Sequence, residues 1–236
     1  VGAFRMVTRA LSGVISTFTE FEFVMAKVNA VSGATESEFK ELSDSAQELG
    51  RTTFFTATQV GELQLAFSKL GFTAKETQRV VDVMAVSFAS SAMDIEKWST
   101  SMTKVAPIAK SAGFSIEDTA AIMSKLTDSG IEASIAGTSL RNILLKMQDP
   151  TSDLTKSFGR TIHGLDDLVP AMKKFVEEGG SMADVMEVVD LRQAAAFEQM
   201  LTTADGTVAL RNALLDANGE GERMALIVGD TLQGAF

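Results

Sequence analysis

The chain has 236 residues, of which 45% are hydrophobic and 22% charged, enough for one large domain or two small ones with a buried core. It contains no Cys, which excludes disulfides, zinc–thiolate centres and cysteine nucleophiles. The 31 acidic and 21 basic residues give a formal net charge of −10, which argues against duplex binding because phosphate repels an acidic surface. The charge also suits a lining past which DNA slides, although solubility alone explains it.

The first 30 residues are apolar-rich but carry interspersed charges. No part of the sequence contains the roughly 20 uninterrupted apolar residues that a membrane-spanning helix needs. We predict an amphipathic N-terminal helix over residues 1–30, whose apolar face has three open roles: oligomerisation, contact with a membrane surface, or ordinary core. Both chain ends are expected to be cuts through a longer polypeptide. The apolar positions at helical spacing are Phe4, Val7, Leu11, Val14, Ile15 and Phe18.

Glycines recur after segments with helical spacing, where a left-handed C-terminal cap favours a residue without a Cβ atom. Three of them precede a large apolar residue, Phe72, Phe114 or Ile131, which predicts Schellman caps. The Gly-Phe-Thr turn at 71–73 is echoed 42 positions later by Gly-Phe-Ser at 113–115. The predicted capping glycines are Gly50, Gly71, Gly113, Gly130, Gly179 and Gly219.

Helix starts are marked as clearly as helix ends. A Ser or Thr followed three positions later by an acidic residue or Gln predicts a capping box, and Asp94 is a further predicted N-cap. Pro107 is expected to kink or break the helix that contains Trp98, and residues 75–88 are apolar nearly all round, which predicts a buried central helix. The predicted boxes are Thr35 with Glu38, Thr56 with Gln59, Thr73 with Glu76 and Ser115 with Asp118.

The segment 149–153 is rich in turn-forming residues, and Asp149 precedes Pro150, so it predicts the main break in the chain. A short extended piece is expected at 161–164. We therefore predict an all-α fold, a compact bundle of helical hairpins with Gly-capped turns. Its parts are the N-terminal helix, a helical core at 31–149 and a second helical part at 150–236, for which continuity with the core stays open. Helices after the break are expected at 165–176, 182–189, 194–201, 208–215 and 224–232.

The sequence offers few groups for chemistry. His163 is the single His, so no His pair can hold a metal, and we expect it on the surface or in a turn. There is no Gly-x-Ser-x-Gly elbow and no phosphate-binding Gly-rich loop. A glycosidase-type acid would need a Glu in an apolar pocket, whereas capping and solubility explain the glutamates here. We predict no catalytic, cofactor or metal site. The glutamates considered are Glu36, Glu38, Glu76, Glu117, Glu177 and Glu178.

Several runs stand out for their order and spacing: 25–34 (MAKVNAVSGA), 49–60 (LGRTTFFTATQV), 105–107 (VAP), 112–115 (AGFS), 129–131 (SGI) and 137–141 (GTSLR), and after the break 191–195 (LRQAA). In this order and spacing they resemble the core region of phage tail tape-measure proteins. The small-residue cluster Ala136-Gly137-Thr138-Ser139 matches the packing pattern of that family. One departure is Val189-Asp190, where the family often has Phe-Gly.

The resemblance implies a structural module of a tail tape-measure protein, which takes part in tail assembly, tail-length determination and genome ejection. Implied partners are copies of itself, with a trimer or hexamer expected, the tail tube, tail-tip or baseplate proteins and assembly chaperones. The implied location is the virion tail, in the tube lumen or at the tip, and the host cytoplasm during assembly. Membrane contact is expected only at ejection. The alternatives are a helical scaffold or adaptor of a tailocin-like particle and a peptidoglycan-degrading module.

Overall fold

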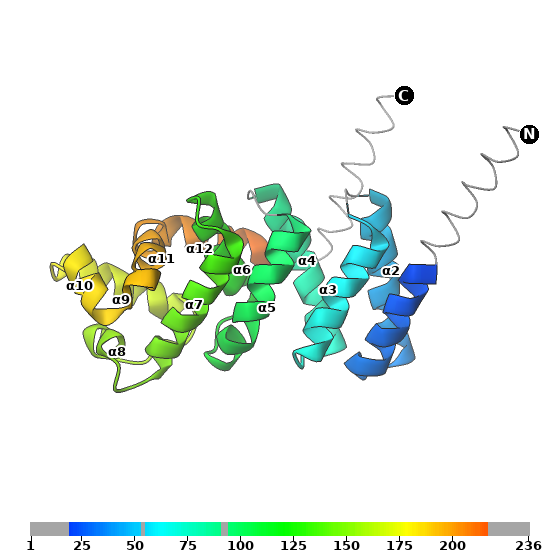
Figure 1. Cartoon of the computed structure of the whole chain (residues 1–236), viewed down its shortest axis with the longest axis horizontal. Helices are drawn as coiled ribbons and strands as arrows, with labels where there is room; N and C mark the ends of the chain where they lie inside the picture. Colours follow the sequence, from blue (N-terminus) through cyan, green and yellow to red (C-terminus); the bar gives the residue numbers. More distant parts are fainter. Residues whose placement is uncertain (1–18, 53–54, 91–93, 217–236) are drawn as a thin grey trace, which may run out of the picture. The chain divides into compact units, whose positions relative to one another are not determined.

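The computed structural model describes residues 19–52, 55–90 and 94–216, and within these ranges the regular structure is helical, without strands. The predicted all-α class is confirmed. The chain divides into two compact units, which meet in sequence at Asp82 and Val83. After a helix formed by residues 19–32, the elements are α2 (Glu36–Thr52), α3 (Ala57–Lys69), α4 (Ala74–Ser90), α5 (Ile95–Ser111), α6 (Ile116–Asp128), α7 (Ala133–Gln148), α8 (Asp153–Phe158), α9 (Leu165–Glu177), α10 (Met182–Val188), α11 (Leu191–Thr202) and α12 (Ala204–Leu215) (Figure 1).

The predicted N-terminal helix falls partly outside the described residues, since residues 1–18 carry its apolar positions from Phe4 to Phe18. The described remainder, from residue 19 on, is helical and buries Phe21, Val24 and Val28. A Cβ atom on Gly61 of α3 would lie 3.1 Å from Cγ1 of Val24, so this helix packs closely on α3. This stretch therefore contributes to the core of the first unit.

Gly50 was expected to end a helix, and this prediction is wrong. Helix α2 continues through it to Thr52, and Gly50 does not have a positive φ. A Cβ atom there would lie 2.4 Å from the backbone nitrogen of Ala57, far inside contact distance. The glycine is needed for a close approach between α2 and the start of α3, which a sequence pattern cannot distinguish from a cap.

The other described glycines confirm the predicted caps. At the end of α3, the N–H of Phe72 donates to the carbonyl of Phe67 at 3.2 Å and that of Gly71 to Ser68 at 3.1 Å, the two bonds of a Schellman motif. Gly113, Gly130 and Gly179 end α5, α6 and α9 in the same way, each with positive φ. Gly219 lies outside the described residues.

The predicted helix starts are also confirmed. The N–H of Thr73 donates to Glu76 at 2.8 Å, and the N–H of Glu76 donates back to the Thr73 hydroxyl at 3.3 Å. The same reciprocal bonds form at the other three predicted boxes, and Asp94 caps α5 through the N–H of Lys97. Within α4, the expected buried helix has Val80, Val81, Val83 and Met84 at 0% exposure.

Pro107 does not break its helix, contrary to one of the expected outcomes. Helix α5 runs from Ile95 to Ser111 with Pro107 inside it, and the flanking residues Val105, Ala106 and Ala109 are buried. Proline removes one backbone hydrogen bond from a helix interior, and burial of its neighbours stabilises the helix against that loss.

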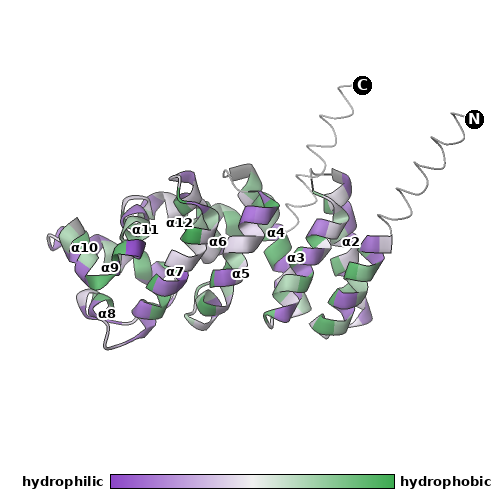
Figure 2. Cartoon of the chain, in the orientation of Figure 1, coloured by the Kyte–Doolittle hydropathy of each residue, from purple (hydrophilic) through white to green (hydrophobic). Residues whose placement is uncertain are grey.

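The second unit is built on α5, α6 and α7, whose buried side chains include Trp98, Met102, Ile143 and Leu144. A helix ends at the predicted break, because α7 stops at Gln148 and Asp149 has an extended backbone, while the division of the chain into two parts at this point stays a prediction. The short helix α8 was not predicted, and residues 161–164 form a loop, not the expected extended piece. Helix α11 packs on α7, and α12 packs on α6 and α9 (Figure 1). Apolar and polar residues are interspersed along each helix, as Figure 2 shows.

Candidate functional site

A cluster of charged groups joins three helices of the second unit, α6, α9 and α12. Its centre is Asp118 on the first turn of α6, a residue that is 5% exposed. One carboxylate oxygen accepts the N–H of Ser115 at 3.2 Å and the N–H of Leu165 at 3.4 Å. The capping box of α6 therefore also binds the first residue of α9.

Arg211 on α12 completes the cluster. Its guanidinium donates to the second oxygen of Asp118 at 3.4 Å and to Asp166 on α9 at 2.6 Å. The side chains of Arg211 and Asp118 are 14% and 8% exposed, whereas Asp166 is 81% exposed. We call these three residues the Arg211 clamp. It fastens α12 to α6 and α9 by charge-assisted hydrogen bonds.

The clamp shifts the pKa values of its members in different directions. Burial raises the pKa of Asp118 above its ordinary value, although its hydrogen bonds with Ser115 and Leu165 and the charge of Arg211 oppose that effect. The hydrogen bond from Arg211 lowers the pKa of Asp166. The same bond raises the pKa of Arg211, so the guanidinium stays charged.

The glutamates considered as candidate acids have two different environments. Glu38 and Glu76 accept backbone N–H groups at helix starts, and Glu177 and Glu178 are exposed, as expected. Glu117 lies in the first turn of α6, as expected for a glutamate at a helix start, but it is only 6% exposed. Its charge acts on Arg211, whose pKa it helps to raise.

His163 lies in the loop before α9 and is exposed, which confirms the expected surface or turn position. Its backbone N–H donates to Asp167 at 3.0 Å, and Nε2 of its ring lies 3.3 Å from the Thr161 hydroxyl. Across the described part of the chain, no group of three or more His, Asp or Glu residues is arranged to hold a metal ion. No described helix is long and apolar enough to cross a membrane.

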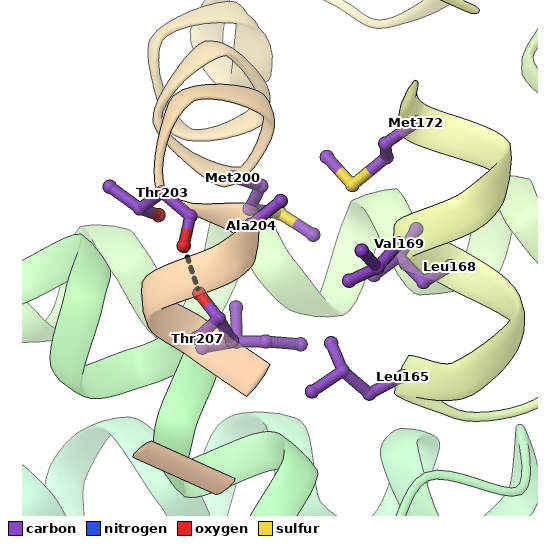
Figure 3. Close-up of a pocket in the computed structure, with 9 residues that line it drawn as sticks. Leu165, Leu168, Val169, Met172, Met200, Thr203, Ala204 and Thr207 are labelled. Atoms are coloured by element: carbon purple, nitrogen blue, oxygen red, sulfur yellow. Dashed lines mark hydrogen bonds between the residues drawn. The ribbon is translucent and has the colours of Figure 1, made fainter. Parts of the chain in front are cut away.

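A small cavity lies among α6, α9, α11 and α12 (Figure 3). Its volume is about 10 Å³, room for about one water molecule and too little for an organic ligand. Its hydroxyls are occupied within the helices, because the Thr207 hydroxyl donates to the carbonyl of Thr203 at 2.9 Å and that of Thr203 to Gln199 at 2.6 Å. The lining residues are Ile122, Leu165, Leu168, Val169, Met172, Met200, Thr203, Ala204 and Thr207.

The small-residue cluster at 136–139 is a helix-packing contact. A Cβ atom on Gly137 would lie 2.7 Å from the carbonyl oxygen of Ser101, so the backbones of α5 and α7 approach closely there. Ala136 and Ser139 are buried beside it, and Ser101 is fully buried. The cluster is therefore a point of close packing in the core, as the family resemblance implied.

Comparison with known proteins identifies the class of protein. Residues 8–228 match the family described as phage-related minor tail protein. The chain belongs to this family, and its role is that of a structural part of a phage tail.

Two curated phage proteins are similar to this chain in sequence. The chain is 26% identical to the tape measure protein of Pneumococcus phage Dp-1 over 92% of its own length. It is 30% identical to the probable tape measure protein of Escherichia phage P2 over 66% of its length. It spans only 24% and 21%, respectively, of the lengths of these relatives. No solved structure matches it.

Proposed function

We propose that this chain is a helical module of a tape-measure protein, one segment of a longer polypeptide that helps to assemble the tail, to set its length and to eject the genome. The observation that carries the proposal is the alignment with the Dp-1 tape measure protein, which covers 92% of the chain. Even as one continuous helix, 236 residues would extend about 350 Å at 1.5 Å per residue. The many turns make the segment much shorter than that. It therefore forms only part of the polypeptide that sets the length of the tail.

The module works through contacts between proteins. Its partners are further copies of itself, as a trimer or hexamer, together with the tail tube, the tail-tip or baseplate proteins and assembly chaperones. Its location is the tube lumen or the tip of the virion tail, and the host cytoplasm during assembly. Large apolar side chains on its described helices are available for such interactions, since Phe23, Ile135 and Leu191 are 61%, 56% and 72% exposed.

A deletion in the virus or prophage that encodes the chain tests the structural role. Removal of codons 19–216 in frame should abolish tailed particles while capsids still form. Mass spectrometry of purified wild-type tails should recover peptides from this segment. Tails of normal number and length after the deletion would refute the proposal.

We further propose that the segment has no catalytic role. Glu117 is the one buried Glu in the described ranges, and its neighbour is the Arg211 clamp. In a peptidoglycan release assay, the wild-type chain and Glu117→Gln should both stay at background. Release by the wild type that disappears in the variant would support the enzyme alternative instead.

A further inference from the structure

The junction between α11 and α12 is a single residue. Thr203 is the C-cap residue of α11 and also the N-cap residue of α12. Its side chain makes no capping hydrogen bond with α12. Its backbone angles are φ −102° and ψ 9°, about 40–50° away from those of an α-helix. The helical bonds on either side are present, because the N–H of Thr203 donates to Gln199 and that of Thr207 donates to Thr203.

A small rotation at Thr203 would therefore merge α11 and α12 into one helix. The N–H groups of the first turn of α12, from Ala204 to Gly206, would then bond to the carbonyls at 200–202. The Thr203 hydroxyl already donates to the carbonyl of Gln199, the bond that a threonine makes inside a helix. The merged helix would span residues 191–215 and extend about 37 Å.

Few large apolar side chains hold α12 in its present position. Helix α12 buries Ala204, Thr207, Leu210 and Leu214, of which only the two leucines are large and apolar. The cavity lies beside the first part of this face, because Ala204 and Thr207 line it (Figure 3). Polar interactions add to this attachment, because the Arg211 clamp and the exposed Lys173–Asp205 pair at 2.6 Å join α12 to α6 and α9.

We propose that α12 is exchanged between copies of this chain: Thr203 becomes helical, α12 swings away from its own α6 and α9, and it docks on the same surface of a second copy. Helix α12 of a second copy fits this surface because the surface presents its ion-pair partners. Asp118 and Asp166 would bind Arg211 of the incoming helix, and Lys173 would bind its Asp205. The ion pairs and apolar packing that α12 gives up in its own chain form again with the second copy, while the merged helix gains backbone hydrogen bonds.

The exchange gives a physical route to the self-association in the proposed function, and it rests on that part of the function. If each copy donates α12 to the next and accepts α12 from the one before, the interface is heterologous, and such interfaces close into rings when the rotation between copies allows it. A trimer or hexamer is a ring of this kind.

Engineered cysteines test the exchange directly, because the chain has none of its own. Lys173→Cys and Asp205→Cys are made in separate chains, mixed after unfolding and refolding, and treated with a short bismaleimide. The inference predicts a covalent dimer joining residue 173 of one chain to residue 205 of another, identified by mass spectrometry. The matched control mixes Lys146→Cys with Asp190→Cys, a pair that joins α7 to the start of α11 on one side of the junction, and should give no such dimer.

The outcomes separate the inference from the proposed self-association. An oligomer without 173–205 links between chains would overturn the exchange and leave self-association by another surface. A monomer at every concentration would overturn both. A second pair of variants acts on the junction itself. The equilibrium constant for merging α11 and α12 should be about fivefold larger per copy in Thr203→Ala than in Thr203→Gly. Both variants lack the hydroxyl bond to Gln199, so equal oligomer fractions in the two would also overturn the inference.

Discussion

The carboxylate of Asp118 and the guanidinium of Arg211 meet at 3.4 Å although 93 positions separate them in the sequence. The interaction joins the start of α6 to α12, across the predicted break at Asp149 and Pro150. Because Asp118 also accepts the N–H of Leu165, one buried carboxylate connects three helices of the second unit. The stability of this unit should therefore depend on the Arg211 clamp more than on its exposed ion pairs.

Replacing Arg211 with Met should destabilise the chain by roughly 1–3 kcal/mol, because the buried carboxylate of Asp118 loses its cation while the apolar stem is largely retained. Urea unfolding followed by circular dichroism measures the change. Lys173→Met is the matched control, since it breaks an exposed ion pair between the same two helices, α9 and α12, and should cost at most about 0.5 kcal/mol. Equal losses in the two variants would show that the clamp has no special role.

The raised pKa of Asp118 predicts a pH dependence of known sign. A carboxyl group whose pKa is raised by folding binds a proton more tightly in the folded state, so its contribution to stability grows as pH falls from 7 through the raised pKa. Asp166 acts in the opposite direction, because its lowered pKa supports the fold above its ordinary value of 3.8 and that support is lost as pH falls through the lowered pKa.

Asp118→Asn isolates the first effect. The free energy of unfolding of the wild type, minus that of the variant, should increase as pH falls from 7 through the raised pKa of Asp118 toward its ordinary value of 3.8. Urea titrations at several pH values measure this difference. A difference that is constant or that shrinks toward acid would contradict the predicted direction of the Asp118 pKa shift.

Gly137→Ala should destabilise the chain by about 1–3 kcal/mol, because the new Cβ atom would lie 2.7 Å from the carbonyl oxygen of Ser101 and force α5 and α7 apart. Gly206→Ala is a control of the same chemistry. Its Cβ atom would meet only Cε of Lys125, at 3.6 Å, and the helix propensity of Ala should stabilise α12 by up to about 1 kcal/mol. Thermal unfolding distinguishes the two variants by the sign of the change in Tm.

The region after Pro150 is proposed to be continuous with the preceding core, because α11 and α12 pack on α7 and α6. A chain that ends at Asp149 should therefore unfold at a lower urea concentration than the full chain and with a broader transition. Limited proteolysis should cut α6 faster in the shortened chain. An unchanged transition would instead make residues 31–149 an independent domain.

Local signals predicted the boundaries of most helices, because a Schellman cap or a capping box involves residues at most a few positions apart. The boxes at Thr73 and Ser115 and the caps at Gly71 and Gly113 are of this kind. Helix α8 was missed because its six residues are too few to show a helical period. Pro107 and Gly50 were misjudged because burial and close approach, which no local pattern shows, determine their roles.

The clamp could not be predicted in the same way. Arg211 occurs in a segment of ordinary helical spacing, and Asp118 was recognised only as a capping residue. Pairing them requires knowledge of how α12 packs on α6, which depends on residues distant in sequence. The small cavity and the one-residue junction at Thr203 likewise follow from packing. Only the family resemblance, carried by several runs in order, indicated the biological role from sequence.

We propose above all that the segment is a structural module that assembles with copies of itself. Light scattering after size-exclusion chromatography measures this most directly, because it gives the mass of the particle in solution independently of its shape. We predict a trimer or a hexamer of the 25.1 kDa chain that persists on dilution. A monomer at all concentrations would contradict the account.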